Sequence, residues 1–308
     1  MNILFLDSVH PILEERLIAE RGWNCIHDYK TSKEDLNMKG VNGLVIRSRF
    51  TIDDTFLSKS PDLKFIARSG SGLENIDLEA CANRNVIVYN SPEGNSTAVA
   101  EHAIGMLLMF ANNLRRADAE VRNREWNREK NRGFEIEGKT VAIIGYGVMG
   151  SAFAKRLKGF GCRVIAFDKY KKNFGNEGVE EVSMEEVFDQ ADIVSLHVPL
   201  KEDTHYLVDE SWLSSFKKSI VLMNTSRGPV VKIAAVIAAI SDGTLKGACL
   251  DVIEYEEKSF ENIGLNHSEF KVLSEFDNVL FSPHVAGWTV ESYVKLSSFL
   301  ADKILRDF

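Results

Sequence analysis

The chain has 308 residues, of which 44% are hydrophobic and 27% charged, and its formal net charge at pH 7 is -8. This length favours two globular domains, and the acidic balance argues against a nucleic-acid-binding protein, which normally carries a basic patch. The first apolar run ends at Asp7, too early for a signal peptide, and the stretch 98–110 is too short to span a membrane. The four cysteines are scattered, which argues against a disulfide scaffold and against a metal site, and favours the reducing cytoplasm.

Short apolar runs alternate with helical stretches over most of the chain. The runs that indicate buried strands are 3–6, 43–46, 63–67, 86–89, 141–144, 163–167, 193–196, 219–224, 248–250 and 279–281. Helices are predicted at 11–21, 96–122 and 150–160, and a capping box of Ser183 and Glu186 begins another. Strands separated by helices predict parallel sheets and an α/β fold. The polar segment 124–134 interrupts this alternation and divides the chain into two related lobes.

The strongest local motif is Gly145-Tyr146-Gly147-Val148-Met149-Gly150, which follows the strand at 141–144 and opens a helix. In such a turn the first glycine allows the tight bend, the second admits a pyrophosphate, and the third lets helix and strand pack closely. Asp168, at the end of the next strand, is placed to accept the ribose hydroxyls, so the sequence predicts NAD rather than NADP. Three nearby lysines weaken that preference: Lys169, Lys171 and Lys172. A glycine-rich turn in a nucleotide-free fold is the alternative.

Three segments follow strands in the C-terminal half, at 224–228, 250–256 and 281–287. Ligands of open α/β sheets bind at the carboxyl ends of strands, so all three segments should open onto one crevice. They contain Arg227, Glu256 and His284. An arginine can clamp a carboxylate, a histidine can take an alcohol proton near neutral pH, and a carboxylate can orient that histidine. Singly, each residue is explained as well by surface charge or turn structure, and spacing does not show that they converge.

Together these motifs resemble those of the D-isomer-specific 2-hydroxyacid dehydrogenases over nearly the whole chain. The matching pieces are 47–49 (RSR), 70–77 (GSGLENID), 90–95 (NSPEGN), 98–101 (AVAE), 145–150, 197–199 (HVP), 225–228 (TSRG), 251–252 (DV) and 283–287 (PHVAG). One departure follows Glu256, where the family usually has a proline and this chain has Glu257 and Lys258. The segment 257–277 is also unusually charged.

The resemblance implies a role for each matched residue. Arg227 would hold the substrate carboxylate and carbonyl, Glu256 would pair with His284, and His284 would shuttle the proton. The residues expected to contact the substrate are Arg47, Ser48, Ser71 and Gly72. The residues expected to bind NAD are Gly145, Gly147, Val148, Met149, Gly150, Asp168, His197, Val198, Pro199, Thr225, Ser226, Asp251 and Gly287.

The resemblance also implies an architecture of two Rossmann-like domains with doubly wound parallel sheets. The NAD domain, 96–285, would be inserted into a flavodoxin-like substrate domain made of 1–95 and 286–308. Members of the family are typically homodimers through the NAD domain, so we expect a homodimer here.

Within the family, the chain looks most like the D-3-phosphoglycerate dehydrogenases, which interconvert 3-phosphoglycerate and 3-phosphohydroxypyruvate in serine biosynthesis. A phosphate needs extra cations, for which Arg47, Arg49 and Arg68 are candidates, with ordinary surface charge as the alternative. No regulatory domain is expected after Phe308. Glyoxylate, hydroxypyruvate and other 2-oxo acids stay open as substrates, as do formate and phosphite. A sensor that binds NAD and acts as a corepressor is the alternative from another class.

Overall fold

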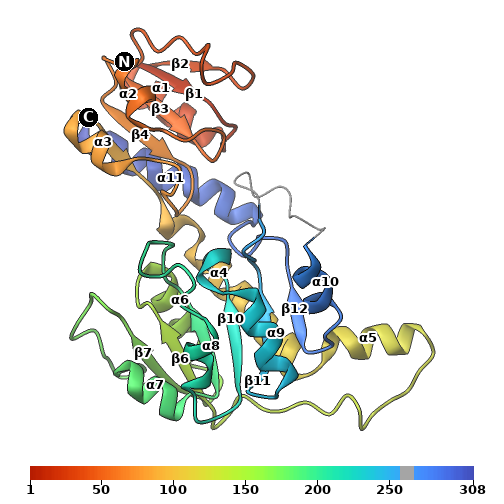
Figure 1. Cartoon of the computed structure of the whole chain (residues 1–308). Helices are drawn as coiled ribbons and strands as arrows, with labels where there is room; N and C mark the ends of the chain where they lie inside the picture. Colours follow the sequence, from red (N-terminus) through yellow and green to blue (C-terminus); the bar gives the residue numbers. More distant parts are fainter. Residues whose placement is uncertain (257–266) are drawn as a thin grey trace. The chain divides into compact units, whose positions relative to one another are not determined.

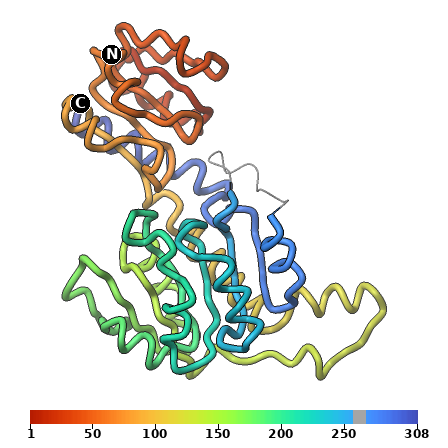
Figure 2. The backbone as a smooth tube through the Cα atoms, in the orientation of Figure 1, coloured from red at the N-terminus to blue at the C-terminus, as the bar shows by residue number. Residues whose placement is uncertain are grey.

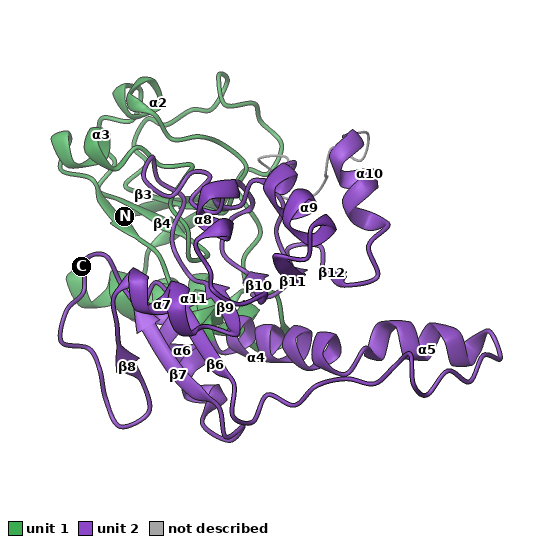
Figure 3. Ribbon diagram, turned by 60° about the horizontal axis from the view of Figure 1, so that its bottom comes forward, with its two compact units in different colours: residues 1–96, 288–308 green, residues 97–287 purple. Residues whose placement is uncertain are grey.

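The computed structural model describes residues 1–256 and 267–308, which divide into two compact units (Figure 3). Unit 1 comprises Met1–Ser96 and Trp288–Phe308, and unit 2 comprises Thr97–Gly287. Each unit has its own parallel sheet with a hydrophobic cluster on either face. The predicted α/β fold with two doubly wound sheets is therefore confirmed. Among the described residues, no helix combines the length and the apolar character needed to cross a bilayer.

Unit 1 is built on a parallel sheet with the strand order β2-β1-β3-β4-β5 (Figure 1). Its strands are β1 (Asn2–Phe5), β2 (Asn24–His27), β3 (Gly43–Ile46), β4 (Phe65–Arg68) and β5 (Ile87–Tyr89). This is the flavodoxin-like order, as predicted. One face packs against α1 (Ile12–Arg21) and α11 (Val290–Asp307), and the other against α2 (Asp54–Ser58) and α3 (Leu78–Asn83).

Unit 2 is built on a parallel sheet with the order β12-β11-β10-β9-β6-β7-β8, whose crossovers can be followed in Figure 2. Its strands are β6 (Thr140–Ile144), β7 (Arg163–Phe167), β8 (Glu180–Glu181), β9 (Ile193–Leu196), β10 (Ile220–Asn224), β11 (Leu245–Leu250) and β12 (Val279–Phe281). The neighbours β6 and β9 lie where the winding reverses, which is the position at which ligands bind in such sheets.

Helices cover both faces of the second sheet because alternate strand residues point to opposite sides. Leu222 of β10 faces a cluster built with α7 (Met184–Gln190), α8 (Glu210–Ser214), α9 (Ile233–Ser241) and α10 (Ser268–Ser274). Its neighbour Met223 faces a cluster built with α6 (Val148–Leu157) and α4 (Pro92–Ala111), which begins in unit 1. A 3-10 turn, η1 (Gly228–Val230), precedes α9.

Two segments differ from what the sequence predicted for them. The helix predicted over 96–122 is two helices, α4 and α5 (Leu114–Arg122), because Asn113 adopts a left-handed conformation with a φ of +51°. Helix α5 and the segment after it extend away from the body of unit 2 (Figures 1 and 3). The charged segment 257–277, expected as a loop, contains α10, while its residues 257–266 lie outside the described residues.

Candidate active site

The glycine turn after β6 is shaped partly by packing within the protein. Gly145 has a φ of +92°, and a Cβ there would lie 2.7 Å from the carbonyl oxygen of His197. A Cβ on Gly150 would lie 2.1 Å from the carbonyl oxygen of Gly145, so backbone contacts require both glycines. Gly147, the N-cap of α6, differs because its Cβ would meet no described atom within 4 Å. The space beside Gly147 at the helix N-terminus therefore suits a phosphate group.

Asp168 follows β7 and is bonded to the glycine turn. Its carboxylate accepts hydrogen bonds from the backbone N–H groups of Tyr146 (2.8 Å), Tyr170 (2.9 Å) and Lys171 (2.8 Å). Burial acts to raise the pKa of this carboxyl group, but the amide hydrogen bonds outweigh burial and hold the pKa below its ordinary value. Asp168 is therefore ionised at neutral pH, as recognition of ribose hydroxyls requires.

The three lysines after Asp168 have acceptors within unit 2. Lys169 pairs with Asp203, Lys171 Nζ donates to the carbonyl oxygen of Tyr146 (3.1 Å), and Lys172 Nζ donates to that of Asp168 (3.4 Å). These contacts weaken the argument that the three lysines would bind the 2′-phosphate of NADP. The preference for NAD that Asp168 indicates is correspondingly stronger.

The side chain of His197, after β9, lies toward the interior of the sheet. Its Nε2 is 2.9 Å from Oγ of Ser195, and its ring packs on Phe153, both of which are fully buried. Burial lowers the pKa of His197 to about 4, so the ring is neutral at physiological pH. Because its carbonyl oxygen adjoins Gly145, the contribution of His197 to a nucleotide site would come from its backbone. Val198 and Pro199 continue the same segment.

The loop after β10 is organised by a buried amide. Asn224 Oδ1 accepts hydrogen bonds from N–H (3.0 Å) and Oγ (2.7 Å) of Ser226, and its Nδ2 donates to the carbonyl oxygen of Arg227 (2.9 Å). A Cβ on Gly228 would lie 1.9 Å from the carbonyl oxygen of Ile253, so this glycine lets the loop meet the one after β11. The segments that carry Arg227 and Glu256 are thereby brought together.

One buried hydroxyl group in the loop after β10 is not hydrogen-bonded by the described residues. Oγ1 of Thr225 is buried and has no hydrogen-bond partner among the described residues. A buried hydroxyl without a partner is unfavourable unless a ligand supplies one. With the open space at Gly147 and the ionised Asp168, it gives three features that fit a bound dinucleotide.

Glu256 and His284 form the closest contact between candidate catalytic groups. Oε2 of Glu256 is 2.6 Å from Nδ1 of His284, and Oε1 accepts the N–H of Ile253, also at 2.6 Å. The carboxylate is thus fixed by its own loop and in turn fixes the imidazole. Since Nδ1 donates to Glu256, Nε2 is the ring atom that would exchange a proton with a substrate. The backbone of His284 is in the left-handed region, with a φ of +52°.

The buried carboxylate of Asp251 holds the segment that presents His284. It accepts hydrogen bonds from the N–H groups of Val285 and Ala286, both at 3.0 Å, and from Oγ of Ser282 at 2.6 Å. The carbonyl oxygen of Asp251 accepts the N–H of His284 at 2.8 Å. The structure thus gives Asp251 a scaffolding role in addition to the cofactor contact expected for it and for Gly287.

In unit 1, the segment 47–50, which includes Ser48, is fixed from both sides. Asp7 accepts the N–H of Arg47 at 2.6 Å, and Asn75 donates to the carbonyl oxygen of Arg47 at 3.2 Å. The guanidinium of Arg47 lies 4.4 Å from the centre of the Trp288 ring, a cation–π arrangement. Stacking leaves the edge of the guanidinium able to donate to an anion.

The other two candidate cations of unit 1 differ from each other. Arg49 donates to the carbonyl oxygens of Leu6 (3.1 Å), Asp28 (2.5 Å) and Thr31 (2.5 Å), so its contacts are structural and disfavour the phosphate-binding hypothesis for this residue. Arg68 lies against Gly70, where a Cβ would come within 1.6 Å of Nη1 of the arginine. Gly70 therefore makes room for this guanidinium at the start of the next loop.

The loop that contains Ser71 and Gly72 follows directly. Oγ of Ser71 donates to Oδ1 of Asn95 at 2.6 Å, and Nδ2 of Asn90 donates to the carbonyl oxygen of Ser71 at 2.6 Å. These bonds fix the loop that was expected to offer backbone N–H groups to the substrate carboxylate.

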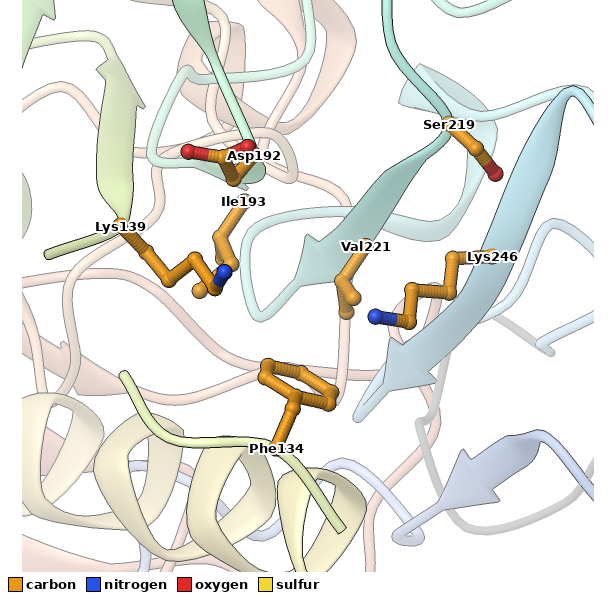
Figure 4. A pocket seen from close by; sticks show the side chains of 7 residues that line it. All are labelled: Phe134, Lys139, Asp192, Ile193, Ser219, Val221 and Lys246. Atoms are coloured by element: carbon orange, nitrogen blue, oxygen red, sulfur yellow. The ribbon is translucent and has the colours of Figure 1, made fainter. Parts of the chain in front are cut away.

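A small hollow lies at the amino ends of the strands of unit 2 (Figure 4). Its volume is about 60 Å³, and it is lined by Phe134, Lys139, Asp192, Ile193, Ser219, Val221 and Lys246. Nζ of Lys246 lies 4.0 Å from the centre of the Phe134 ring, and Asp192 accepts the N–H of Thr140. This hollow is at the opposite end of the strands from the glycine turn, so it is separate from the candidate active site. The described residues contain no cluster of three side chains able to hold a metal ion.

Four residues that shape these segments were not singled out from the sequence. They are Asn224, Ser282 and His102 in unit 2 and Trp288 in unit 1. Asn224 carried a usable signal, since an asparagine two residues before a serine is typical of a side-chain-bonded turn. The contacts of the other three depend on strand order and could not be read from spacing.

Comparison with known proteins defines the class of this protein. Residues 104–286 match the family description "D-isomer specific 2-hydroxyacid dehydrogenase, NAD binding domain". The chain belongs to this family, as its motifs predicted.

Individual relatives within the family differ in their activities. The chain is 33% identical over 301 residues to the D-3-phosphoglycerate dehydrogenase of Archaeoglobus fulgidus, covering 96% of this chain and 55% of that protein. It is 34% identical over 277 residues to the glyoxylate reductase of Thermococcus litoralis, covering 87% and 81%. The D-lactate dehydrogenase of Aquifex aeolicus, solved in complex with NAD and lactic acid, superposes with a TM-score of 0.83 at 26% identity, covering 100% and 95%. The chain spans about half the length of the curated phosphoglycerate dehydrogenases it matches.

Proposed function

We propose that the protein is an NAD-dependent oxidoreductase that transfers a hydride between nicotinamide and C2 of a small D-2-hydroxy acid. The observation that carries this proposal is the Glu256–His284 pair, at 2.6 Å, in which the loop of Glu256 also meets the loop of Arg227. A proton acceptor and a carboxylate clamp are the groups that oxidation of a 2-hydroxy acid requires from the protein. Membership of the family supports the same reaction class.

The chemistry of the residues follows from their hydrogen bonds. NAD, when bound, supplies the hydride acceptor. Nε2 of His284 takes the proton of the substrate hydroxyl, while Nδ1–H stays bonded to Glu256. The carboxylate of Glu256 stabilises the imidazolium that forms and keeps the ring oriented, without itself taking the proton. Arg227 binds the substrate carboxylate with paired hydrogen bonds, and in the reverse direction His284 returns the proton to the carbonyl oxygen.

We assign NAD binding to 96–285 and substrate binding to 1–95 with 286–308. The division of the chain after Ser96 and after Gly287 supports this assignment. The NAD site would use the glycine turn with Val148 and Met149, Asp168, the backbone of 197–199, Thr225, Ser226, Asp251 and Gly287. The open space at Gly147 and the buried hydroxyl of Thr225 support it. Unit 1 would contribute Arg47, Ser48, Ser71 and Gly72 to substrate recognition.

We favour 3-phosphoglycerate and 3-phosphohydroxypyruvate, the substrate pair of a serine-biosynthetic dehydrogenase. Three phosphoglycerate dehydrogenases are 33%, 34% and 30% identical to this chain. Within unit 1, the stacked guanidinium of Arg47 and the guanidinium that Gly70 accommodates at Arg68 are cations suited to a second anionic group. The similarity to a glyoxylate reductase makes an unphosphorylated 2-oxo acid the second candidate.

The decisive experiment is NADH oxidation against 3-phosphohydroxypyruvate, hydroxypyruvate, glyoxylate and pyruvate. A clear preference for the phosphorylated acid, reduced by Arg47→Ala, would support the favoured substrate. Activity on the unphosphorylated acids alone would keep the reaction class and discard that substrate. Tight NADH binding without turnover of any acid would refute the enzyme and favour an NAD-sensing binding protein.

We also propose a homodimer formed through unit 2. The extension that contains α5 exposes large apolar side chains, of which Trp126 is 77% exposed and Leu114 and Val121 are each 51% exposed. Apolar groups on a projecting arm are typical of a surface that is covered by a partner. Light scattering after size exclusion should give twice the monomer mass, and Val121→Glu with Trp126→Glu should reduce it. A monomeric wild-type protein would refute this proposal.

We also propose a cytoplasmic location, which thiol chemistry supports. All four cysteines are free thiols, and two of them, Cys81 and Cys249, are buried. Free thiols persist where disulfides are kept reduced, so we place the protein in the cytoplasm. Fractionation of cells that contain the tagged protein would test this.

A further inference from the structure

A histidine outside the catalytic trio is linked to the loop that presents His284. Nε2 of His102, on α4, lies 2.8 Å from Oγ of Ser282, which follows β12. Oγ of Ser282 lies 2.6 Å from Oδ1 of Asp251, which follows β11. His102, Ser282 and Asp251 all belong to unit 2, and together we call them the relay cluster.

The carboxylate at one end of the relay cluster determines the direction of both hydrogen bonds. An ionised carboxylate can only accept, so the single hydroxyl proton of Ser282 points at Asp251. Oγ of Ser282 must then be the acceptor toward His102, and Nε2 of His102 carries a proton. This order places the serine in the middle, so the cluster is not a hydrolytic triad, in which the histidine lies between the serine and the acid.

The far end of the cluster reaches the catalytic loop. The same carboxylate of Asp251 accepts the N–H groups of Val285 and Ala286, the two residues after His284. His284 itself has a φ of +52°, a conformation that costs free energy for a side chain of this size and persists only where its surroundings enforce it. Asp251 is therefore one of the groups that hold this conformation, and its carboxylate in turn accepts a hydrogen bond from Ser282.

We propose that His102 is a positioning residue, which acts through Ser282 and Asp251 to hold the 282–287 segment in the conformation that presents His284. The donor at Nε2 of His102 fixes the Ser282 hydroxyl as donor to Asp251, and the carboxylate then stays aligned with both amides. This inference rests on the proposed function for its effect on turnover, while its effect on the loop does not depend on any reaction.

The alternative is that His102 only fills space on α4. Its side chain is 27% exposed, and the neighbour one turn along, Met106, also contacts Oγ of Ser282 through its sulfur at 3.7 Å. A packing role needs the volume of the side chain, whereas a positioning role needs the donor at Nε2. Two substitutions of similar size separate these roles: His102→Gln retains an Nε2–H donor, and His102→Leu does not.

The first measurement is hydrogen exchange of the segment 282–287, followed by mass spectrometry on the full-length protein. We expect its protected amides to exchange about tenfold faster in His102→Leu, the effect of losing roughly one hydrogen bond, and to keep wild-type protection in His102→Gln. In a Ser282→Ala background, His102→Leu should have a smaller effect than in the wild type, because contacts in one chain of hydrogen bonds are not additive, and what remains would come from the direct approach of Nε2 of His102 to Oδ1 of Asp251 at 3.6 Å. Equal exchange in wild type and His102→Leu, or equal acceleration in the Gln and Leu variants, would overturn the proposal.

The second measurement is turnover with the best acid of the panel above, together with NADH binding by fluorescence. Loss of positioning should lower kcat about tenfold in His102→Leu, with restoration in His102→Gln and little change in the Kd for NADH. If the wild-type protein turns over no acid, the proposed function fails and the exchange experiment still decides the role of His102. If the wild type is active and the kcat of His102→Leu is unchanged, the positioning role is wrong although the enzyme assignment stands.

Discussion

The glycine turn allows one substitution that separates folding from cofactor binding. In Gly147→Ala, the new Cβ meets no described atom within 4 Å, and the backbone, with φ -83° and ψ -155°, is extended and does not require glycine. Removing a glycine from such a position usually stabilises the fold by about 0.4–1 kcal/mol, because the unfolded chain has fewer conformations. We therefore expect the free energy of unfolding of the apoprotein to stay the same or rise slightly.

The methyl group would occupy the space that we assign to the pyrophosphate. Forcing one extra carbon into a close contact costs about 1–3 kcal/mol, so the Kd for NADH should rise by a factor of roughly 5 to 150. Urea unfolding of the apoprotein and titration with NADH, followed by fluorescence, measure the two effects separately.

Gly150→Ala is the matched control because the same methyl group is added three residues later. There, the Cβ would lie 2.1 Å from the carbonyl oxygen of Gly145, a backbone atom that cannot move aside cheaply. This variant should lose stability before any ligand is added. A destabilised Gly147→Ala apoprotein, or one that binds NADH with wild-type affinity, would refute the reasoning.

Four further predictions follow from the contacts above. His284→Ala should lower turnover by about 10²–10⁴-fold with NADH binding retained, and near-normal turnover would remove His284 from the mechanism. Asp168→Asn should raise the ratio of kcat/KM for NADPH over NADH roughly tenfold or more, because one like charge beside the 2′-phosphate is removed; an unchanged ratio would mean that Asp168 does not contact the ribose. Arg49→Ala should lower the urea midpoint, since three carbonyl oxygens lose their donor, whereas Arg47→Ala should mainly raise KM for a phosphorylated acid; the reverse pattern would exchange their roles. Finally, burial lowers the pKa of His197 to about 4 in the native state, whereas the ordinary pKa of a histidine in the unfolded chain is about 6.5. As the pH falls below about 6.5, His197 therefore binds a proton in the unfolded chain while it stays neutral in the native state. Stability should therefore fall between pH 6.5 and 4, by about 2 kcal/mol at pH 5 from this group alone, and His197→Gln should lose less stability than wild type between pH 7 and pH 5 in urea unfolding.

Most strands that the sequence predicted are buried on both faces, and β5, of which only Tyr89 is buried, is the exception. Strands such as β6 and β10 are fully buried, so they appear as continuous apolar runs. Strand β2 was missed because it is a sheet edge with the sequence NCIH, of which three residues are exposed. Its place in the sheet is set by pairing with β1, a contact that leaves no hydrophobic pattern in its own residues.

The break between α4 and α5 shows a different limit. The apolar and helical composition of 96–122 continues through Asn112 and Asn113, so its periodicity gives no stop signal. Asparagine adopts the left-handed conformation more readily than most residues, and Asn113 uses this property, with its Nδ2 donating to the carbonyl oxygen of Arg132. The partner lies in the polar segment that returns toward the sheet, and that proximity is a property of the fold.

The candidate catalytic trio could be proposed from the sequence because its members follow strands that are neighbours in the sheet. The order β12-β11-β10 places the segments after all three strands side by side, although they are about 30 residues apart in the chain. Motif knowledge selected Arg227, Glu256 and His284 from among the polar residues of those segments. The 2.6 Å between Glu256 and His284 and the close approach of the two loops at Gly228 come from strand register, which the motifs do not show.

The same strand order explains why the supporting residues were missed. His102 and Ser282 are 180 positions apart, and neither belongs to a motif with a spacing of its own. They come together because α4 packs on one face of the sheet. Cys249 of β11 points to the same face, and its Sγ lies next to the carbonyl oxygen of Met106 on α4. A helix held there can place a side chain at the carboxyl end of β12, where Ser282 emerges. The residues that we propose for the chemistry are therefore visible as motifs, whereas the residues that we propose to hold them become visible only when the helix and the strand have been placed together.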